Sequence, residues 1–209
     1  MTSPEAEAPA PRTRGRQLAG ALAKLWFAPM LIGLPFARVS RARINADVVR
    51  WAQATSRPGA SVLTLLAAYP EFRTLFCYRL RRAGTVAALV GTVAKVVFPG
   101  ERTLHLACSD IGGGLFIQHG FATVVAARKV GENCWINQQV TIGFDSPGAR
   151  PTLGNNVSVH AGAKVLGDIT LGDGARIGAN AVVLNNVPPG YTAVGIPARL
   201  LPPKSQRNQ

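Results

Sequence analysis

The sequence predicts a mainly β protein, in which a parallel β-helix of hexapeptide repeats follows a small α-helical N-terminal domain. The first observation is a period of six, because an aliphatic residue opens each of six successive hexads: Leu153, Val159, Val165, Leu171, Ile177 and Val183. The second is that the fifth residue of each hexad is also small or apolar: Val157, Ala163, Ile169, Ala175, Ala181 and Val187. A helix repeats about every 3.6 residues and a strand every second residue. A sustained period of six residues predicts instead a coil of short strands and turns.

The chain divides into three parts by composition. Residues 1–17 are rich in Pro, Ala, Glu and Arg and are predicted to be a disordered basic tail. Residues 18–102 carry helical patterns and form the predicted N-terminal domain. Residues 103–209 contain the hexads and a C-terminal tail.

Residues 18–36 are apolar but are interrupted by Lys24, Pro29, Gly33 and Pro35. A helix that spans a membrane needs about 20 uninterrupted apolar residues, so this stretch is poor material for one. Arginines follow this stretch directly, and no cleavage site of small residues, as a signal peptide would have, comes after it. Two interpretations stay open: a surface-lying membrane contact through residues 18–43, or a helix packed on this protein or a neighbouring subunit.

Three further helical stretches complete the N-terminal domain. Residues 44–56 read as a helix that ends before Arg57-Pro58-Gly59. Residues 60–82 read as helical with a break at Tyr69-Pro70, and residues 85–98 form another apolar helix that ends at Pro99-Gly100.

The hexads are interrupted at two places. Residues 123–129 run one residue beyond the register, which predicts an outward bulge. Residues 144–152 contain Pro, Gly and Ser and are predicted to leave the coil as a loop. Pro188-Pro189-Gly190 end the last coil.

The charge is unevenly distributed. Residues 1–102 hold 15 basic and 5 acidic residues, whereas residues 103–209 hold 8 and 5, which together give the net charge of +13. A basic half suits an anionic partner, but no nucleic-acid motif accompanies it, so we expect no nucleic-acid binding. Cys77, Cys108 and Cys134 are odd in number and lack metal-ligand spacing, which indicates free thiols in the cytoplasm and no bound metal.

His119 is the candidate catalytic residue. It occupies the third place of its hexad, where a side chain leaves the coil, and it lies just before the predicted bulge. A neutral imidazole is suited to taking a proton from a hydroxyl near neutral pH. Asp110 and Asp145 are the two acids that could orient it. We expect His105, which precedes the first regular hexad, to cap the end of the coil. We expect His160 to face solvent.

Residues 103–201 resemble the serine acetyltransferase family of hexapeptide acyltransferases. The resemblance is carried by GGGLFIQHGFATVV, VTIG, HAGAKVLGDITLGDGARIGANAVV and VPPGYTAVGIPARLL, and the Tyr78-Arg79-Leu80 stretch is a weaker match to the N-terminal domain of that family. The resemblance implies a left-handed β-helix and acetyl-CoA as co-substrate. It also implies a homotrimer or a dimer of trimers, with active sites between adjacent coils.

The resemblance assigns roles to several residues. His119 matches the general base, and Gly143, Ala161 and Ala179 would offer backbone amides to the pantetheine arm of CoA. Gln118, Asp145 and Arg150 are the candidate acceptor-binding residues.

The acceptor is predicted from departures from the family pattern. The family aspartate one coil before the histidine corresponds to Thr103 or Leu104, and Gln118 replaces the acid beside it. The Arg-His pair of the loop reads Ala149-Arg150, and an Asp-Pro of the N-terminal domain reads Arg57-Pro58. A zwitterion needs paired charges, so these departures speak against serine. The GLFIQHG core resembles the branch of the family that acetylates sugars of surface polysaccharides, and this resemblance implies, as the main expectation, an O-acetyltransferase acting on a carbohydrate hydroxyl. The alternatives are a serine O-acetyltransferase and a catalytically inactive scaffold, and we expect the protein in the cytoplasm, free or at the inner face of the membrane.

Overall fold

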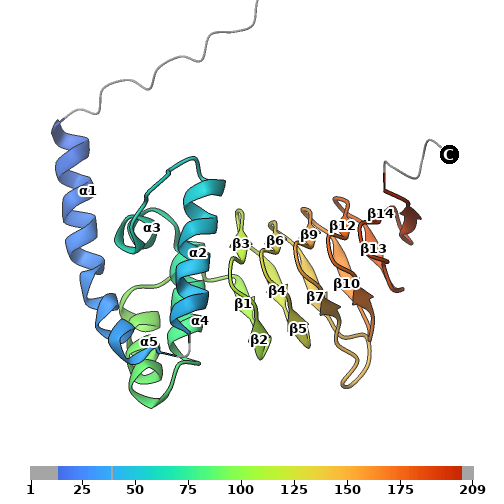
Figure 1. Ribbon diagram of the computed structural model, residues 1–209, viewed down its shortest axis with the longest axis horizontal. Coiled ribbons are helices and arrows are strands. Elements are labelled where there is room, and N and C mark those ends of the chain that lie inside the picture. The colour runs from blue at the N-terminus through green and yellow to red at the C-terminus, as the bar shows by residue number, and fades with distance from the viewer. Residues whose placement is uncertain (1–13, 39, 204–209) are drawn as a thin grey trace, which may run out of the picture.

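A computed structural model gives the structure of the protein and describes residues 14–38 and 40–203. Helices lie at one end of an elongated molecule, and short strands stacked in coils form the rest (Figure 1). The predicted fold class is confirmed. The helices are α1 (Arg14–Phe27), the 3-10 helix η1 (Ala28–Phe36), α2 (Arg41–Ala54), α3 (Val62–Ala68), α4 (Pro70–Leu80) and α5 (Thr85–Val97).

The helix boundaries follow local signals in the sequence. The hydroxyl of Ser61 accepts a hydrogen bond from the Thr64 amide at 3.3 Å and caps α3. Pro70 opens α4, where its missing N–H costs nothing. One expectation is wrong in part: residues 14–17, assigned to the disordered tail, form the first turn of α1, while residues 1–13 lie outside the described residues.

The stretch Leu18–Phe36 is long and apolar enough, by length and composition alone, to cross a membrane, and 11% of it is buried. One side of η1 packs on the protein. Met30 is fully buried, and a Cβ on Gly33 would lie 3.0 Å from Cδ1 of Leu80 and 3.2 Å from Cγ1 of Val90. The other side of the stretch is exposed, as Ile32 is at 61%.

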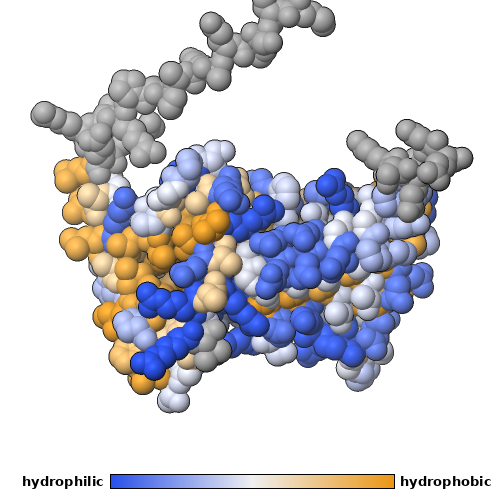
Figure 2. Space-filling model, in the orientation of Figure 1, coloured by the Kyte–Doolittle hydropathy of each residue, from blue (hydrophilic) through white to orange (hydrophobic). Residues whose placement is uncertain are grey.

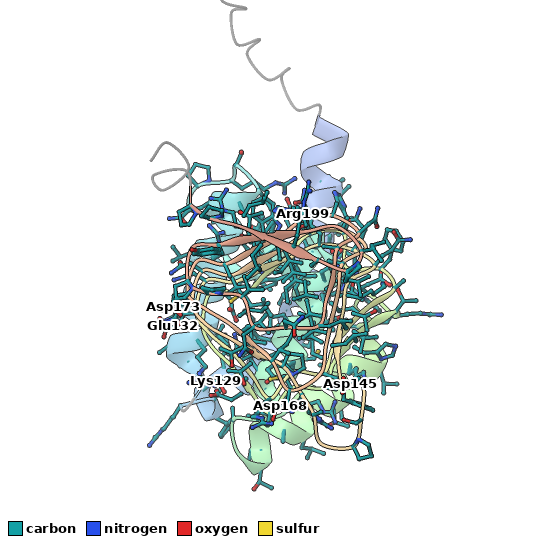
Figure 3. All side chains as sticks on the ribbon, turned by 90° about the vertical axis from the view of Figure 1, so that its right-hand side faces the viewer. Lys129, Glu132, Asp145, Asp168, Asp173 and Arg199 are labelled. Atoms are coloured by element: carbon teal, nitrogen blue, oxygen red, sulfur yellow. The ribbon has the colours of Figure 1, made fainter. Side chains whose placement is uncertain are left out.

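Three sheets form the faces of a prism, which Figure 3 shows along its axis. Sheet 1 contains β1 (Leu104–Leu106), β4 (Thr123–Val125), β7 (Thr141–Gly143), β10 (Lys164–Leu166) and β13 (Val182–Val183). Sheet 2 contains β2 (Asp110–Ile111), β5 (Lys129–Val130), β8 (Thr152–Leu153) and β11 (Thr170–Leu171). Sheet 3 contains β3 (Phe116–Ile117), β6 (Trp135–Ile136), β9 (Ser158–Val159), β12 (Arg176–Ile177), β14 (Thr192–Val194) and β15 (Arg199–Leu201).

The interior of the prism is filled by the residues that the period of six selects. All six hexad openers and all six fifth-place residues are buried, and the most exposed of them, Ile169, is at 8%. Cys108 and Cys134 are fully buried in the same core. Burial raises the pKa of the Cys134 thiol to about 11.

The extra residue of the coil lies earlier than the sequence predicts. Five residues, 118–122, join β3 to β4, whereas four join β6 to β7, β9 to β10 and β12 to β13. The stretch that follows β4 has the ordinary length. The bulge is therefore the corner that contains His119, because a corner outside the strand pairs can lengthen without breaking a ladder.

A buried ion pair joins the helices to the first coil. The Arg79 guanidinium donates to Asp47 at 2.8 and 3.1 Å, and both side chains are 2% exposed. The Asp47 carboxylate also accepts from the amides of Gly114 and Leu115, at 2.8 and 3.1 Å. Arg79 donates further to the carbonyls of Ile111 and Gly112. Each partner satisfies backbone groups of the coil, so the helical region and the β-helix meet in a fixed register.

Candidate active site

His119 is an exposed residue at the corner where the chain passes from sheet 3 to sheet 1. Its φ is 53° and that of Ala122 is 51°, both in the left-handed region that residues other than glycine seldom adopt. The Phe121 amide donates to the His119 carbonyl at 2.8 Å and tightens the turn. This corner presents His119 at the surface, as a catalytic base requires.

Four corner residues form a column along this edge of the prism. Each follows, by two residues, a strand residue that pairs with the next coil of sheet 3. The four, which we call the corner column, are His119, Gln138, Ala161 and Ala179. The N–H groups of Ala161 and Ala179 donate to no acceptor in the part of the chain that the structure describes. The edge that carries the imidazole therefore also carries free backbone donors, which suit the carbonyls of an extended ligand.

Gly143 lies outside the corner column. It ends β7, where it pairs with Leu166 at the far end of the sheet 1 strands, and its carbonyl accepts from the Gly167 amide at 3.2 Å. Gly143 is eighteen residues before Ala161, but the loop between them shifts the register, so Ala161 stacks beside Gln138 instead. Within one chain, Gly143 is therefore not stacked with Ala161 and Ala179.

Two buried polar atoms beside the corner column have no hydrogen-bond partner among the described residues. They are the side-chain carbonyl oxygens of Asn137 and Gln138, one coil beyond Gln118 and His119. Buried polar atoms are almost always paired in folded proteins, so an unpaired couple indicates a place for a ligand donor. The sequence analysis did not select these residues, although three consecutive amide side chains at residues 137–139 are the signal.

Helix α4 supports the His119 corner from below. The Glu71 carboxylate accepts from the Gly120 amide at 3.3 Å. A Cβ on Gly120 would lie 3.1 Å from Cγ of Glu71 and 3.3 Å from Cδ2 of Leu104. Thr103 and Leu104 are the two candidates for the place of the family aspartate, and Glu71 brings a carboxylate close to Leu104 from another element. Sequence reasoning missed Glu71, because only the tertiary fold brings it there.

A second set of hydrogen bonds fixes the far side of the corner. The Ala122 amide donates to the Thr103 hydroxyl at 2.7 Å, and that hydroxyl donates to Oε1 of Glu101 at 2.7 Å. These bonds from Thr103 lower the pKa of the Glu101 carboxyl. The corner is thus held by two carboxylates that both come from outside the coil.

The other predicted acceptor residues divide between two edges. Gln118 is half-buried beside His119. Asp145 and Arg150 lie in the loop between β7 and β8, at the edge between sheets 1 and 2, and Figure 3 shows Asp145 at that edge. Asp145 accepts from the Ser146 hydroxyl at 3.1 Å, and Arg150 stacks 5.7 Å from the Phe144 ring centroid. One chain therefore does not bring these two residues to its own His119, because the loop and the histidine follow different sheets.

The remaining candidates have other surroundings. Asp110 forms an ion pair with Arg43 at 2.9 Å and does not orient His119. The ring of His160 contacts that of Trp135, with centroids 6.0 Å apart. Among residues 14–38 and 40–203, no three His, Cys, Asp or Glu side chains gather as metal ligands would.

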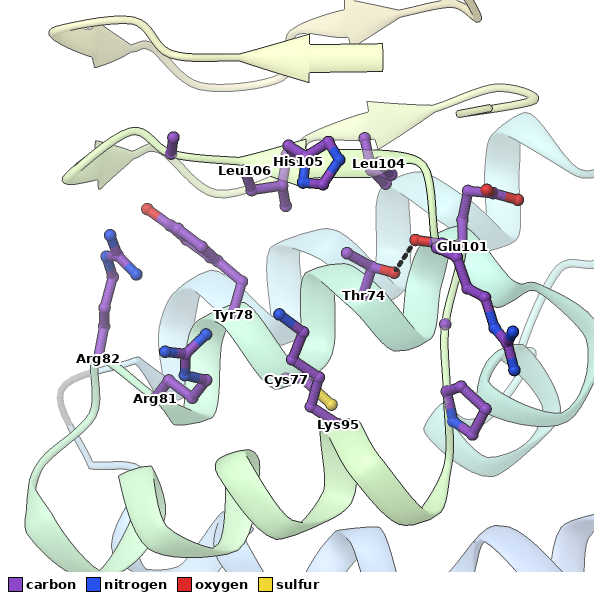
Figure 4. Close-up of a pocket in the computed structure, with 14 residues that line it drawn as sticks. Thr74, Cys77, Tyr78, Arg81, Arg82, Lys95, Glu101, Leu104, His105 and Leu106 are labelled. Carbon is purple, nitrogen blue, oxygen red and sulfur yellow. Dashed lines mark hydrogen bonds between the residues drawn. The ribbon is translucent and has the colours of Figure 1, made fainter. Parts of the chain in front are cut away.

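A cationic pocket of about 430 Å³ lies between α4, α5 and β1 (Figure 4). Arg81, Arg82, Lys95 and Arg102 line it together with one acid, Glu101. Leu104 also lines it, but no member of the corner column does, so the pocket and the column are separate features.

Comparisons with known proteins agree with this geometry. Residues 150–185 match the family described as bacterial transferase hexapeptide (six repeats). A serine acetyltransferase of Helicobacter pylori is 43% identical over 147 residues, which span 66% of this chain and 84% of that protein. The serine acetyltransferase of Synechococcus elongatus is 39% identical over 154 residues, and there the match spans 66% of this chain and 60% of the relative.

A solved serine acetyltransferase in complex with CoA has the same fold. It superposes with a TM-score of 0.63 and 26% identity, over 88% of this chain and 85% of that one. The fold and these sequence relatives lead to one conclusion: the chain belongs to the serine acetyltransferase family of hexapeptide-repeat acyltransferases.

Proposed function

We propose that the protein is a serine O-acetyltransferase that moves the acetyl group of acetyl-CoA to the hydroxyl of L-serine, with His119 as general base. The observation that carries the proposal is the corner column, in which an exposed imidazole lies on the same edge as the free amides of Ala161 and Ala179. The names of the relatives support serine over the carbohydrate acceptor that the departures from the family pattern led us to expect.

The reaction needs a base and an electrostatic support, and no covalent enzyme intermediate. His119 takes the proton of the serine hydroxyl as its oxygen attacks the thioester carbonyl. The tetrahedral oxyanion collapses, the C–S bond breaks, and the CoA thiolate leaves with the proton that the imidazole held. A base of this kind contributes about 10²–10⁴ in rate.

The corner supplies positioning as well as the base. Glu71 and Thr103 fix the amides of Gly120 and Ala122, and so hold His119 in its left-handed conformation. We assign Glu71 as a positioning residue that substitutes for the aspartate missing at Leu104. The free amides of Ala161 and Ala179 would bind carbonyls of the pantetheine arm, and Asn137 and Gln138 would accept from N–H groups of CoA or serine.

A neighbouring copy completes the site in this proposal. The family resemblance implies active sites between coils of adjacent subunits. Asp145 and Arg150 lie at the edge between sheets 1 and 2, whereas His119 of the same chain lies at the edge between sheets 3 and 1. In a homotrimer, the loop of one subunit would reach the corner of the next. Arg150 would then pair with the serine carboxylate, and Asp145 with its ammonium group.

The acceptor is tested by thiol release from acetyl-CoA, measured with L-serine and, separately, with a panel of sugars. Acetylation of serine at a turnover well above that with any sugar supports the proposal. Faster turnover with a sugar would restore the carbohydrate acceptor. Release of no thiol with any acceptor, from protein that still binds CoA, would indicate an inactive scaffold.

A further inference from the structure

The helical end of the molecule exposes an apolar surface that the proposed reaction does not use. We call it the apolar face; its members come from α1, η1 and α5. They are Leu18, Leu22, Leu25, Trp26, Ile32, Phe36, Val86, Leu89, Val93, Val96 and Val97, each between 49% and 78% exposed. Monomeric soluble proteins rarely expose a continuous patch of this kind without a binding role. Figure 2 shows the apolar residues gathered over this end, whereas the β-helix is largely hydrophilic.

The members form one surface because η1 packs along α5, and the C-terminal end of α1 meets the C-terminal end of α5. Trp26 contacts Phe98 edge to face, with ring centroids 5.8 Å apart. At one end, Leu22, Leu25 and Trp26 line an open apolar groove with Val97. At the other end, Phe36 and Val86 line a shallow hollow together with Arg38. The exposed positions of α5 recur at helical spacing, so that helix turns one whole face to solvent.

The charge around the apolar face has a single sign. No acidic residue occurs between Ala8 and Ala46 or between Phe72 and Gly100, the two segments that build this surface. The exposed cations Lys24 and Arg38 lie within the first of these segments, and Arg38 borders the apolar face beside Phe36 and Val86. Two copies that met face to face would bring these cations together, which is unfavourable. An anionic partner is the complementary one.

We propose that the apolar face docks on the surface of an anionic lipid bilayer, with its apolar side chains in the boundary between headgroups and acyl chains. Exposed Trp and Phe beside Lys and Arg are the composition of a helix that lies in a membrane interface. The contact is peripheral, because Met30 of η1 is fully buried, Gly33 is packed against α4 and α5, and Lys24 interrupts the apolar run.

The test is co-sedimentation of the full chain with phosphatidylcholine vesicles and with phosphatidylcholine–phosphatidylglycerol vesicles. We expect binding to the anionic vesicles that weakens as salt is raised. The double variant Leu89→Glu/Val93→Glu should lower the bound fraction about tenfold or more. Val49→Glu is the matched control, because Val49 is 56% exposed on α2, outside the apolar face, and it should bind like the wild type.

Trp26 gives a second measurement that needs no charge variant. It is 63% exposed, whereas Trp51 is 1% exposed and Trp135 is half-buried on β6, outside the apolar face. Brominated lipid should therefore quench the fluorescence of the wild type but not of Trp26→Phe. Equal binding to both vesicle types, binding that survives the double variant, or absence of quenching would overturn the proposal. Self-association without vesicles that the double variant abolishes would also overturn it and assign the face to a second copy. Thiol release by the soluble double variant should stay unchanged, so failure here is distinct from failure of the proposed reaction.

Discussion

At the scale of single residues, the site depends on a carboxylate that reaches the coil from a helix. Glu71 lies in the first turn of α4, and its carboxylate accepts from the amide of Gly120, which follows His119. A hydrogen bond to a charged group contributes about 1.5–3 kcal/mol when it is well formed. Part exposure of Glu71 reduces that value, so its loss should loosen the corner without unfolding the protein.

Replacement of Glu71 by Ala should lower kcat roughly tenfold, because the imidazole would no longer be held in one orientation. KM for acetyl-CoA should change little, and the shape of the pH–rate profile should change with kcat. Glu71→Gln keeps an acceptor for the Gly120 amide and should recover part of the rate. Glu132→Gln, an exposed residue on the far side of the coil, is the control. Unchanged kcat and pH profile in Glu71→Ala would contradict the positioning role.

The thiols give a prediction that follows from burial. All three cysteines are buried and free, and desolvation raises the pKa of Cys77 and of Cys134 to about 11. Since the raised pKa favours the thiol form, roughly one thiol in a thousand at either site is ionised at pH 8. A thiol reagent should therefore react slowly with the native protein and rapidly with three groups after denaturation. Fast reaction of the native protein would show that one of these sites opens.

At the scale of elements, the Asp47–Arg79 pair joins helices α2 and α4 to the first coil. Removal of one partner leaves a buried charge without compensation, which typically costs about 3–5 kcal/mol. Asp47→Asn should therefore lower the free energy of unfolding by several kcal/mol, measured by denaturant titration. Asp168→Asn is the matched control, because it breaks the exposed Arg128–Asp168 pair at 2.8 Å. The control should change the free energy of unfolding by only a few tenths of a kcal/mol. An equally small loss in Asp47→Asn would contradict the structural role of the Asp47–Arg79 pair.

The β-helix could be predicted from the sequence because its inward positions repeat along the chain. Leu153, Val159 and their successors carry the pattern without any tertiary information. The helices could be placed from breaks such as Tyr69-Pro70. The position of the bulge could not, since the residues around His119 are compatible with extra length on either side of β4.

The candidate site could be predicted only where its residues are close in sequence. His119 was found from its place in a hexad, and Ala161 and Ala179 from the family resemblance. Gly143 lies off the row of Ala161 and Ala179 in its own chain, because the loop at residues 144–152 shifts the register. Glu71 was missed, since nothing in the local sequence indicates that α4 packs beneath Gly120.

At the scale of the whole molecule, the proposed trimer joins two edges that one chain keeps apart. His119 lies between sheets 3 and 1, and Arg150 between sheets 1 and 2. His119→Ala and Arg150→Ala chains should each be nearly inactive alone. Mixed trimers, made by co-expression, should regain up to about a quarter of wild-type activity, because about one site in four then combines two intact residues from different chains. No recovery in trimers shown to be mixed would contradict a site shared between subunits.

The most direct measurement of the central claim is the rate at which acetylated serine appears, followed by mass spectrometry, for the wild type and for His119→Ala. The wild type should convert acetyl-CoA and L-serine to O-acetylserine and CoA, and the variant should bind CoA equally well but react at least about a hundredfold more slowly. A variant that forms O-acetylserine at the rate of the wild type would contradict the account.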